Sequence, residues 1–388
     1  MSKIEAVYKR LCAFSVLREL LGSNLIKCFF EFARSEKQDD RLQKYGAFVN
    51  EIYEGGGNLA SCIRKMLFEN ENVFVKAVAK KAEINANIKS ATESELDALT
   101  MLAELTPSDF FDSCELQIPM YDTDTVNFKA EYLERAKNIE KYGYGIFASH
   151  GMFSVSDSGE ISAIESADKI SLDKFIGYKL ERQRVIDNTV AFIEGRPAAN
   201  ILLYGDAGTG KSSSVKAVAN HFFDMGVRLI EIRKNQLLLL PKVMAEISKN
   251  PLKFIIFIDD LSFNKNDDSF SMLKATLEGS ASVKAQNAVI YATSNRRHIV
   301  KETFSDREGN DVHRNDTVQE TLSLSERFGL TILFAKPEKK LYLEIIHELA
   351  ARNGIDITPE LDTKAEAFAL NRGYRSARCA EQFIDSLL

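Results

Sequence analysis

The 388-residue sequence is poor in the residues that build disulfide-held or metal-held domains. Its five cysteines are scattered, odd in number and form no Cys-x-x-Cys pair. Its five histidines are dispersed and lack the spacing of metal ligands. We therefore expect reduced, mostly buried thiols, and neither a zinc site nor disulfides.

Long hydrophobic runs are also missing, as is a strong excess of either charge. The longest apolar stretches fall far short of a membrane span, and the first ten residues carry charges throughout, unlike a signal peptide. The net charge of -6 argues against a broad nucleic-acid surface but leaves room for a local basic patch. We therefore predict a cytoplasmic protein with no membrane partner.

The front of the chain has a helical pattern. Apolar side chains recur at three- and four-residue spacing through most of residues 1–135, which predicts an N-terminal, mainly helical domain. Residues 92–95, Thr-Glu-Ser-Glu, have the form of a capping box, so a helix is expected to begin there. Residues 136–171 are predicted to be a linker with a short β-hairpin, whose strands span 144–155 and 160–164.

The pattern changes after residue 171, where short apolar strands alternate with helical segments. This alternation predicts an α/β core with a parallel sheet at 172–336, and residues 337–388 leave room for about three helices. Functional groups in such a sheet gather at the carboxyl ends of the strands. The expected strands span residues 201–204, 227–232, 254–258, 287–291 and 330–334.

Residues 205–212 have the spacing Gly-x-x-x-x-Gly-Lys-Ser, between the first of these strands and an amphipathic helix expected from Ser213. The glycines let successive backbone N–H groups point at phosphate oxygens, and the helix N-terminus adds partial positive charge. Lys211 is expected to contact the β- and γ-phosphates, and Ser212 to ligate Mg²⁺. The predicted nucleotide-binding residues of this segment are Gly205, Asp206, Ala207, Gly208, Thr209, Gly210, Lys211, Ser212 and Ser213.

Polar residues also follow the third and fourth strands. Asp259 and Asp260 end the third strand, and their adjacent charges repel each other unless a cation or a water uses them. Asp259 is predicted to hold Mg²⁺ through water, and Asp260 to orient or deprotonate the attacking water. Asn295 is the first choice for the side chain that holds this water against the γ-phosphate, with Thr293 and Ser294 as alternatives.

Together these residues resemble the motifs of the AAA+ ATPases. The sequences G-D-A-G-T-G-K-S at 205–212, I-D-D-L-S-F at 258–263 and A-T-S-N-R at 292–296 resemble the Walker A, Walker B and sensor 1 motifs of that family. The resemblance implies the AAA+ form of the P-loop NTPase fold, with a small C-terminal helical lid at 337–388 and with ATP and Mg²⁺ as ligands.

Two longer segments narrow the resemblance. Y-A-T-S-N-R-R-H at 291–298 and S-L-S-E-R-F-G-L at 323–330 are similar to a bacterial AAA+ family catalogued as domain of unknown function 815. The likeness is strong over 172–388 and loose over the helical front end.

Further site residues are implied by this resemblance. Ile176 and Gly177, in F-I-G-Y, resemble the box that packs on adenine. Arg327 resembles the arginine finger that enters the neighbouring subunit's site, which implies a homo-oligomer, commonly a six-membered ring. Arg378 resembles the sensor 2 residue that contacts the γ-phosphate within its own subunit, with Arg375 as the alternative.

The sequence also departs from the family. Many AAA+ enzymes have Glu where this chain has Asp260. The replication initiators and helicase loaders of the family are similar to this chain in having Asp-Asp here. Residues 233–241 contain no aromatic-hydrophobic-glycine pore loop, which disfavours a threading unfoldase. The polar insertion at 301–321 is either a surface loop or an oligomer contact.

We therefore expect an ATPase that remodels or loads an unknown protein client, which the helical front end recruits. A nucleotide-gated binding module with little ATP turnover is the alternative. Nucleic-acid binding through Arg296 and Arg297 is a third possibility, which the net charge does not favour.

Overall fold

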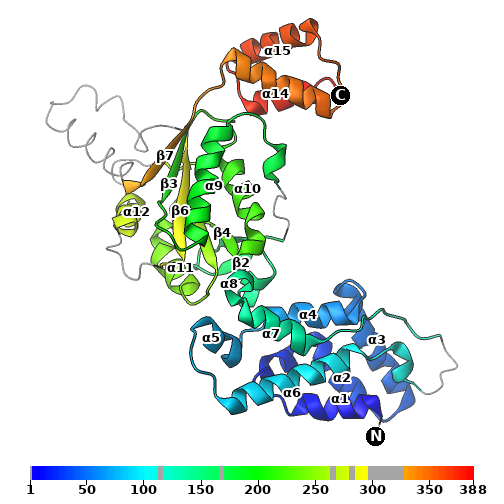
Figure 1. Ribbon diagram of the computed structural model, residues 1–388. Coiled ribbons are helices and arrows are strands. Elements are labelled where there is room, and N and C mark those ends of the chain that lie inside the picture. Colours follow the sequence, from blue (N-terminus) through cyan, green and yellow to red (C-terminus); the bar gives the residue numbers. More distant parts are fainter. Residues whose placement is uncertain (1, 112–116, 166–169, 263–267, 279–284, 296–326) are drawn as a thin grey trace. The chain divides into compact units, whose positions relative to one another are not determined.

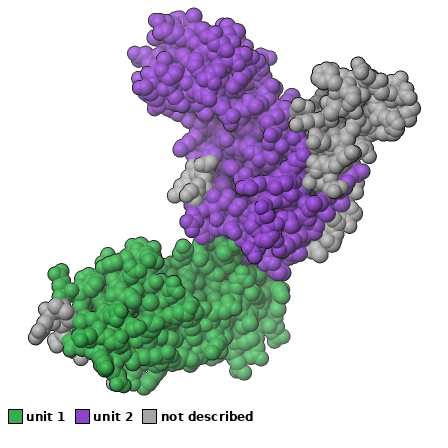
Figure 2. Space-filling view, turned by 180° about the vertical axis from the view of Figure 1, so that it is seen from behind, with its two compact units in different colours: residues 1–149 green, residues 150–388 purple. Residues whose placement is uncertain are grey.

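The computed structural model describes residues 2–111, 117–165, 170–262, 268–278, 285–295 and 327–388. The chain divides into two compact units, Met1–Ser149 and His150–Leu388, which Figure 2 distinguishes by colour. No helix in the described ranges is long and apolar enough to cross a membrane. The domain limits that we predict at residues 135, 171 and 336 stay predictions.

The first unit is helical, as its apolar spacing predicts (Figure 1). Its apolar faces meet in a core rich in phenylalanine, in which Phe29, Phe48 and Phe128 are fully buried. Several helices begin at a side chain that accepts a hydrogen bond from the first turn. These caps are Ser2, Ser23, Asn58, Asn72, Asn85 and Asn127. The helices are α1 (Lys3–Cys12), α2 (Asn24–Arg34), α3 (Gln38–Glu54), α4 (Leu59–Glu69), α5 (Val73–Ala79), α6 (Ala86–Ala103), α7 (Phe128–Lys137) and α8 (Ile139–Tyr142).

The helix start that we predict at residues 92–95 is wrong. α6 begins at Ala86, so Glu95 lies inside the helix. The Glu95 carboxylate accepts hydrogen bonds of 2.7 to 3.1 Å from the backbone N–H groups of residues 15–17 and from the Ser15 hydroxyl. It is 5% exposed. Glu95 therefore accepts hydrogen bonds from a turn that is far away in the sequence, and the local sequence pattern does not reveal this contact.

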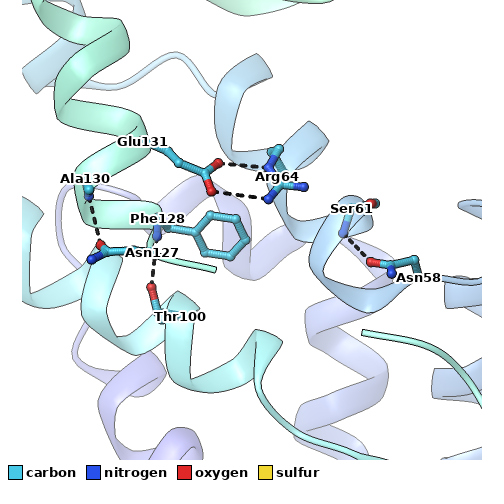
Figure 3. A network of polar contacts seen from close by, with 8 residues as sticks. All are labelled: Asn58, Ser61, Arg64, Thr100, Asn127, Phe128, Ala130 and Glu131. Carbon is cyan, nitrogen blue, oxygen red and sulfur yellow. Dashed lines mark hydrogen bonds and ion pairs between the residues drawn. The ribbon is translucent and has the colours of Figure 1, made fainter. Parts of the chain in front are cut away.

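A second polar network joins α4, α6 and α7 within this unit (Figure 3). Arg64 Nε and Nη2 donate to the two carboxylate oxygens of Glu131 at 2.8 and 3.2 Å, with the guanidinium over the Phe128 ring. Phe128 N donates to the Thr100 hydroxyl at 3.2 Å. The Arg64 and Glu131 side chains are 33% and 35% exposed, so the ion pair contributes less than about 1 kcal/mol.

The second unit contains the predicted parallel sheet, which confirms the α/β class. Its seven strands lie in the order β2-β1-β4-β5-β6-β3-β7. All neighbours pair in parallel except β1 and β2, which are antiparallel. The strands are β1 (Met152–Val155), β2 (Ile161–Ala163), β3 (Ile201–Gly205), β4 (Val227–Glu231), β5 (Lys253–Ile258), β6 (Ala288–Ser294) and β7 (Leu330–Phe334).

The hairpin that we assign to a linker forms one edge of this sheet. β1 pairs with β4, and β2 adds outside it. The strand expected at 144–155 begins only at Met152, because Gly145–Ala148 form a 3₁₀ helix. Residue alternation predicts a hairpin but cannot show which later strand it joins, since that pairing is decided by tertiary contact.

Helices cover both faces of the sheet (Figure 1). α9 and α10 pack on one face through Val185, Val215 and Val218, and α11 and α12 lie on the other. The three C-terminal helices share a core of their own around Tyr342 and Phe383. The helices of this unit are α9 (Lys179–Ile193), α10 (Lys211–His221), α11 (Leu240–Ile247), α12 (Asp268–Glu278), α14 (Lys339–Arg352), α15 (Pro359–Arg372) and α16 (Ala377–Asp385).

The Glu95 contacts make a prediction about the stability of the first unit. Glu95→Ala should lower its free energy of unfolding by about 3 kcal/mol, because three backbone N–H groups lose their acceptor in a buried place. Hydrogen exchange of the amides at 15–17, followed by mass spectrometry on the full chain, measures this directly.

Glu93→Ala is the matched control on the same helix. Its carboxylate pairs with Lys129 at 3.0 Å and is 30% exposed, so we expect a loss below about 1 kcal/mol. Equal exchange rates at 15–17 in the two variants would contradict the assignment.

Candidate functional site

The Gly-x-x-x-x-Gly-Lys-Ser loop follows β3, which lies between β6 and β7 in the sheet. Gly205 has φ +136°, and a Cβ there would lie 2.1 Å from the carbonyl oxygen of Phe334. Gly208 and Gly210 also have positive φ, and Gly210 is the N-cap of α10. The helix begins at Lys211, two residues before the predicted start. The loop can take this path against β7 only because glycine adopts these backbone angles and has no side chain.

The Lys211 side chain lies inside the loop, and the residue is 6% exposed. Its ammonium group donates to the carbonyl oxygens of Gly205 and Asp206 at 2.9 and 2.7 Å, and to Asn295 Oδ1 at 3.1 Å. Burial lowers the pKa of Lys211, while the carboxylates of Asp206, Asp259 and Asp260 oppose that shift. These contacts place a positive charge at the centre of the loop.

Ser212 and Asp259 lie side by side at the carboxyl end of β5. The Ser212 hydroxyl donates to Asp259 Oδ1 at 2.6 Å, and the Thr293 hydroxyl donates to the same oxygen. One hydroxyl and one carboxylate suit Mg²⁺, which keeps several waters and takes phosphate oxygens as its other ligands. The two residues predicted to hold the metal thus fit it. No cluster of three or more His, Cys, Asp or Glu residues that could hold a metal ion occurs in the described part of the chain.

Asp260 and Asn295 also meet at this edge. Asn295 Nδ2 donates to Asp260 Oδ1 at 2.8 Å, while its amide oxygen accepts from Lys211. Asp260 has φ +49°, a conformation that costs a non-glycine residue about 1 kcal/mol or more. Its N–H donates to the Thr293 hydroxyl at 2.9 Å, which holds this turn. Three residues are candidates for the side chain that holds the attacking water. Thr293 and Ser294 belong to β6 and are buried, and Asn295 is exposed.

A cavity of about 150 Å³ opens beside the loop. Ile176 lies on its wall, and Gly177 forms the next turn with φ +70° against Leu341. Ser213 lies on the wall too, whereas Asp206 and Ala207 are exposed. The sequence did not indicate several lining residues, because they come from separate elements and share no motif. These are Lys174, Arg182, Ile345, Leu349 and Glu381.

The two arginines proposed for sensor 2 have different surroundings. Arg375 forms a bidentate pair with Glu366, at 3.0 and 2.7 Å, inside the C-terminal helices. Arg378 is exposed, lines the cavity, and donates its backbone N–H to the Gly208 carbonyl oxygen at 3.3 Å. Arg375 therefore has a structural partner, and Arg378 is the arginine that lies next to the loop.

Arg327 lies shortly before β7, at the opposite end of this strand from the loop. The register pairs Ile201 with Leu330 and Gly205 with Phe334, so the loop follows the carboxyl ends of β3 and β7. Arg327 precedes their amino ends. Residues 323–326 of the finger motif, the insertion at 301–321, and Arg296 and Arg297 lie outside the described residues.

The strand order and the position of the loop define the class of this protein. Read from β7, the five strands of the core lie in the order β7-β3-β6-β5-β4, with the glycine-rich loop after β3 and Asp259-Asp260 after β5. This is the AAA+ form of the P-loop fold. The chain belongs to the family described as "Protein of unknown function (DUF815)", which it matches over residues 148–388.

The chain is also similar to part of a chaperone. The chain is 26% identical over 237 residues to "Chaperone protein ClpB 2" of Parasynechococcus marenigrum (strain WH8102). The match covers 55% of this chain but only 24% of the chaperone. It therefore supports a distant AAA+ relationship.

The close approach at Gly205 makes a prediction. Gly205→Ala should lower the midpoint of thermal unfolding of the second unit by roughly 5 °C or more, because the new Cβ would overlap the backbone of Phe334. Gly46→Ala in α3 is the control, since no atom lies within 4 Å of a Cβ there. Circular dichroism during heating measures both, and equal midpoints would contradict this account of the loop.

Proposed function

We propose that this chain is an ATPase that binds MgATP at the 205–212 loop and uses its hydrolysis to remodel or load a partner protein. One observation carries the proposal. Lys211, Asn295 and Asp260 form a continuous set of hydrogen bonds across the carboxyl ends of β3, β6 and β5. A cation, an amide and a carboxylate at one strand edge are the groups that phosphoryl transfer to water requires.

Each group has a defined part in this proposal. Lys211 exchanges its contacts with the loop carbonyls for the β- and γ-phosphates, and the loop N–H groups hold the same oxygens. Ser212 and Asp259 hold Mg²⁺, which neutralises charge on the phosphates when bound. Asp260 accepts a proton from the attacking water, and Asn295 orients that water.

The position of Arg327 supports action between two copies of the chain. Residues 330 and 334 are four strand positions apart, or about 13 Å along β7. Arg327 precedes this strand and the loop packs at its far end, which supports a role outside the phosphate site of its own chain. We propose that Arg327 enters the site of a neighbouring subunit in a homo-oligomer, with a six-membered ring favoured. The helical first unit, which has its own core, would recruit the client.

The proposal is tested by ATP turnover of the purified full chain. Lys211→Ala should abolish measurable ATP binding in calorimetry, Asp260→Asn should lower turnover about 100-fold, and Arg327→Ala about 1000-fold. Wild-type turnover no faster than that of Asp260→Asn would favour the nucleotide-gated binding module instead.

Mixing Asp260→Asn with Arg327→Ala tests whether Arg327 acts between subunits. In an equal mixture half of the sites retain Asp260, and half of these face an intact Arg327, so about a quarter of wild-type turnover should return. Mixtures of Asp260→Asn with an Asp260→Asn, Arg327→Ala double variant are the control and should stay inactive. No recovery in an assembled mixture would overturn action in trans.

The surroundings of the two C-terminal arginines make a further prediction. Arg378→Ala should lower ATP turnover about 10-fold or more without changing the unfolding midpoint, because Arg378 lies on the cavity and forms no ion pair with any residue that the structure describes. Arg375→Ala should instead lower the unfolding midpoint, because Glu366 loses its bidentate partner. Turnover and thermal unfolding measured on both variants distinguish the roles, and the reverse pattern would contradict them.

A further inference from the structure

Arg182 is the most deeply buried charged side chain on the cavity wall. It comes from the first turns of α9, and the residue is 6% exposed. The other charged residues on the wall, Lys174, Arg378 and Glu381, are exposed. A buried arginine beside a nucleotide cavity therefore needs a physical explanation.

The guanidinium group of Arg182 is only partly satisfied within the chain. Nη2 donates to the Gly177 carbonyl oxygen, and the group lies 4.8 Å from the centre of the Phe175 ring. No carboxylate in the described part of the chain forms an ion pair with it. Burial lowers the pKa of Arg182, while the nearby Glu181 and Tyr178 oppose that shift. A guanidinium has five N–H donors, so donors remain for a ligand.

The surrounding wall indicates which part of a nucleotide these donors face. Gly208, Thr209 and Gly210 form the phosphate end of the cavity, at the N-terminus of α10. Arg182 lies with Phe175 and Ile176, and α14 contributes the apolar residues Ile345 and Leu349. Apolar surfaces with a few placed donors suit a flat aromatic base better than a phosphate.

We propose that Arg182 contacts the nucleotide base and donates a hydrogen bond to a purine ring nitrogen. This inference rests on the proposed function, since it concerns the same nucleotide. It goes further by assigning base recognition to a side chain outside every motif in the sequence. The competing explanation is that Arg182 only holds the Gly177 carbonyl in its turn.

The test uses ATP and three analogues in which carbon replaces N1, N3 or N7 of adenine. Calorimetry measures their dissociation constants for the wild type and for Arg182→Met, which keeps much of the side-chain length but has no donor. One analogue should bind the wild type about 10-fold more weakly than ATP, as expected for a lost hydrogen bond to a charged group. That difference should disappear in Arg182→Met.

Two controls separate base contact from other roles. Arg184→Met, at an exposed position on the same helix, should discriminate among the analogues as the wild type does. Inorganic tripolyphosphate, which has no base, should bind Arg182→Met and the wild type equally. Arg182→Gln, which retains an amide donor, serves as the second variant if Arg182→Met does not fold.

Three results would overturn the inference. They are equal binding of all four nucleotides to the wild type, the same discrimination in the Arg182 variants, and weaker tripolyphosphate binding in those variants. Each leaves ATP binding itself intact. Failure of the wild type to bind ATP at all would instead remove the proposed function, so the two failures are distinguishable.

Discussion

The Lys211 ammonium group is the interaction on which the arrangement of this site depends. It is buried inside its own loop and bonds to the carbonyl oxygens of Gly205 and Asp206, so the loop closes around a positive charge. Its third bond, to Asn295, connects that charge to β6 and through Asp260 to β5. Three adjacent strands are thereby held in one polar network that a triphosphate would have to enter.

The loop imposes a second constraint on the fold around it. Gly205 lies so close to the Phe334 backbone that a side chain cannot be accommodated, which fixes β7 beside β3. Gly208 in turn approaches Ser376 and Arg378 of the C-terminal helices. Glycines therefore allow strand, loop and helices to come together around one cavity, where larger residues would hold them apart.

Much of the fold could be predicted from the sequence. Period-two and apolar patterns predicted the five core strands, and helical spacing predicted the first unit, because these patterns depend on burial of one face. What could not be predicted were contacts with residues far away in the sequence. Glu95 lies within α6 and bonds to residues 15–17, and the hairpin of β1 and β2 joins β4. Local propensity has no information about such partners.

The sequence by itself determined the chemistry of the loop, because glycine spacing, lysine and serine have only local geometric requirements. It also indicated Asp259, Asp260 and Asn295, since the ends of parallel strands must share one edge. Only the tertiary structure separated Arg375, which pairs with Glu366, from Arg378 beside Gly208. Only the tertiary structure shows that Arg182 lies at the cavity. The wall consists of elements that are far apart in the chain, so no local sequence pattern indicates that they are in contact.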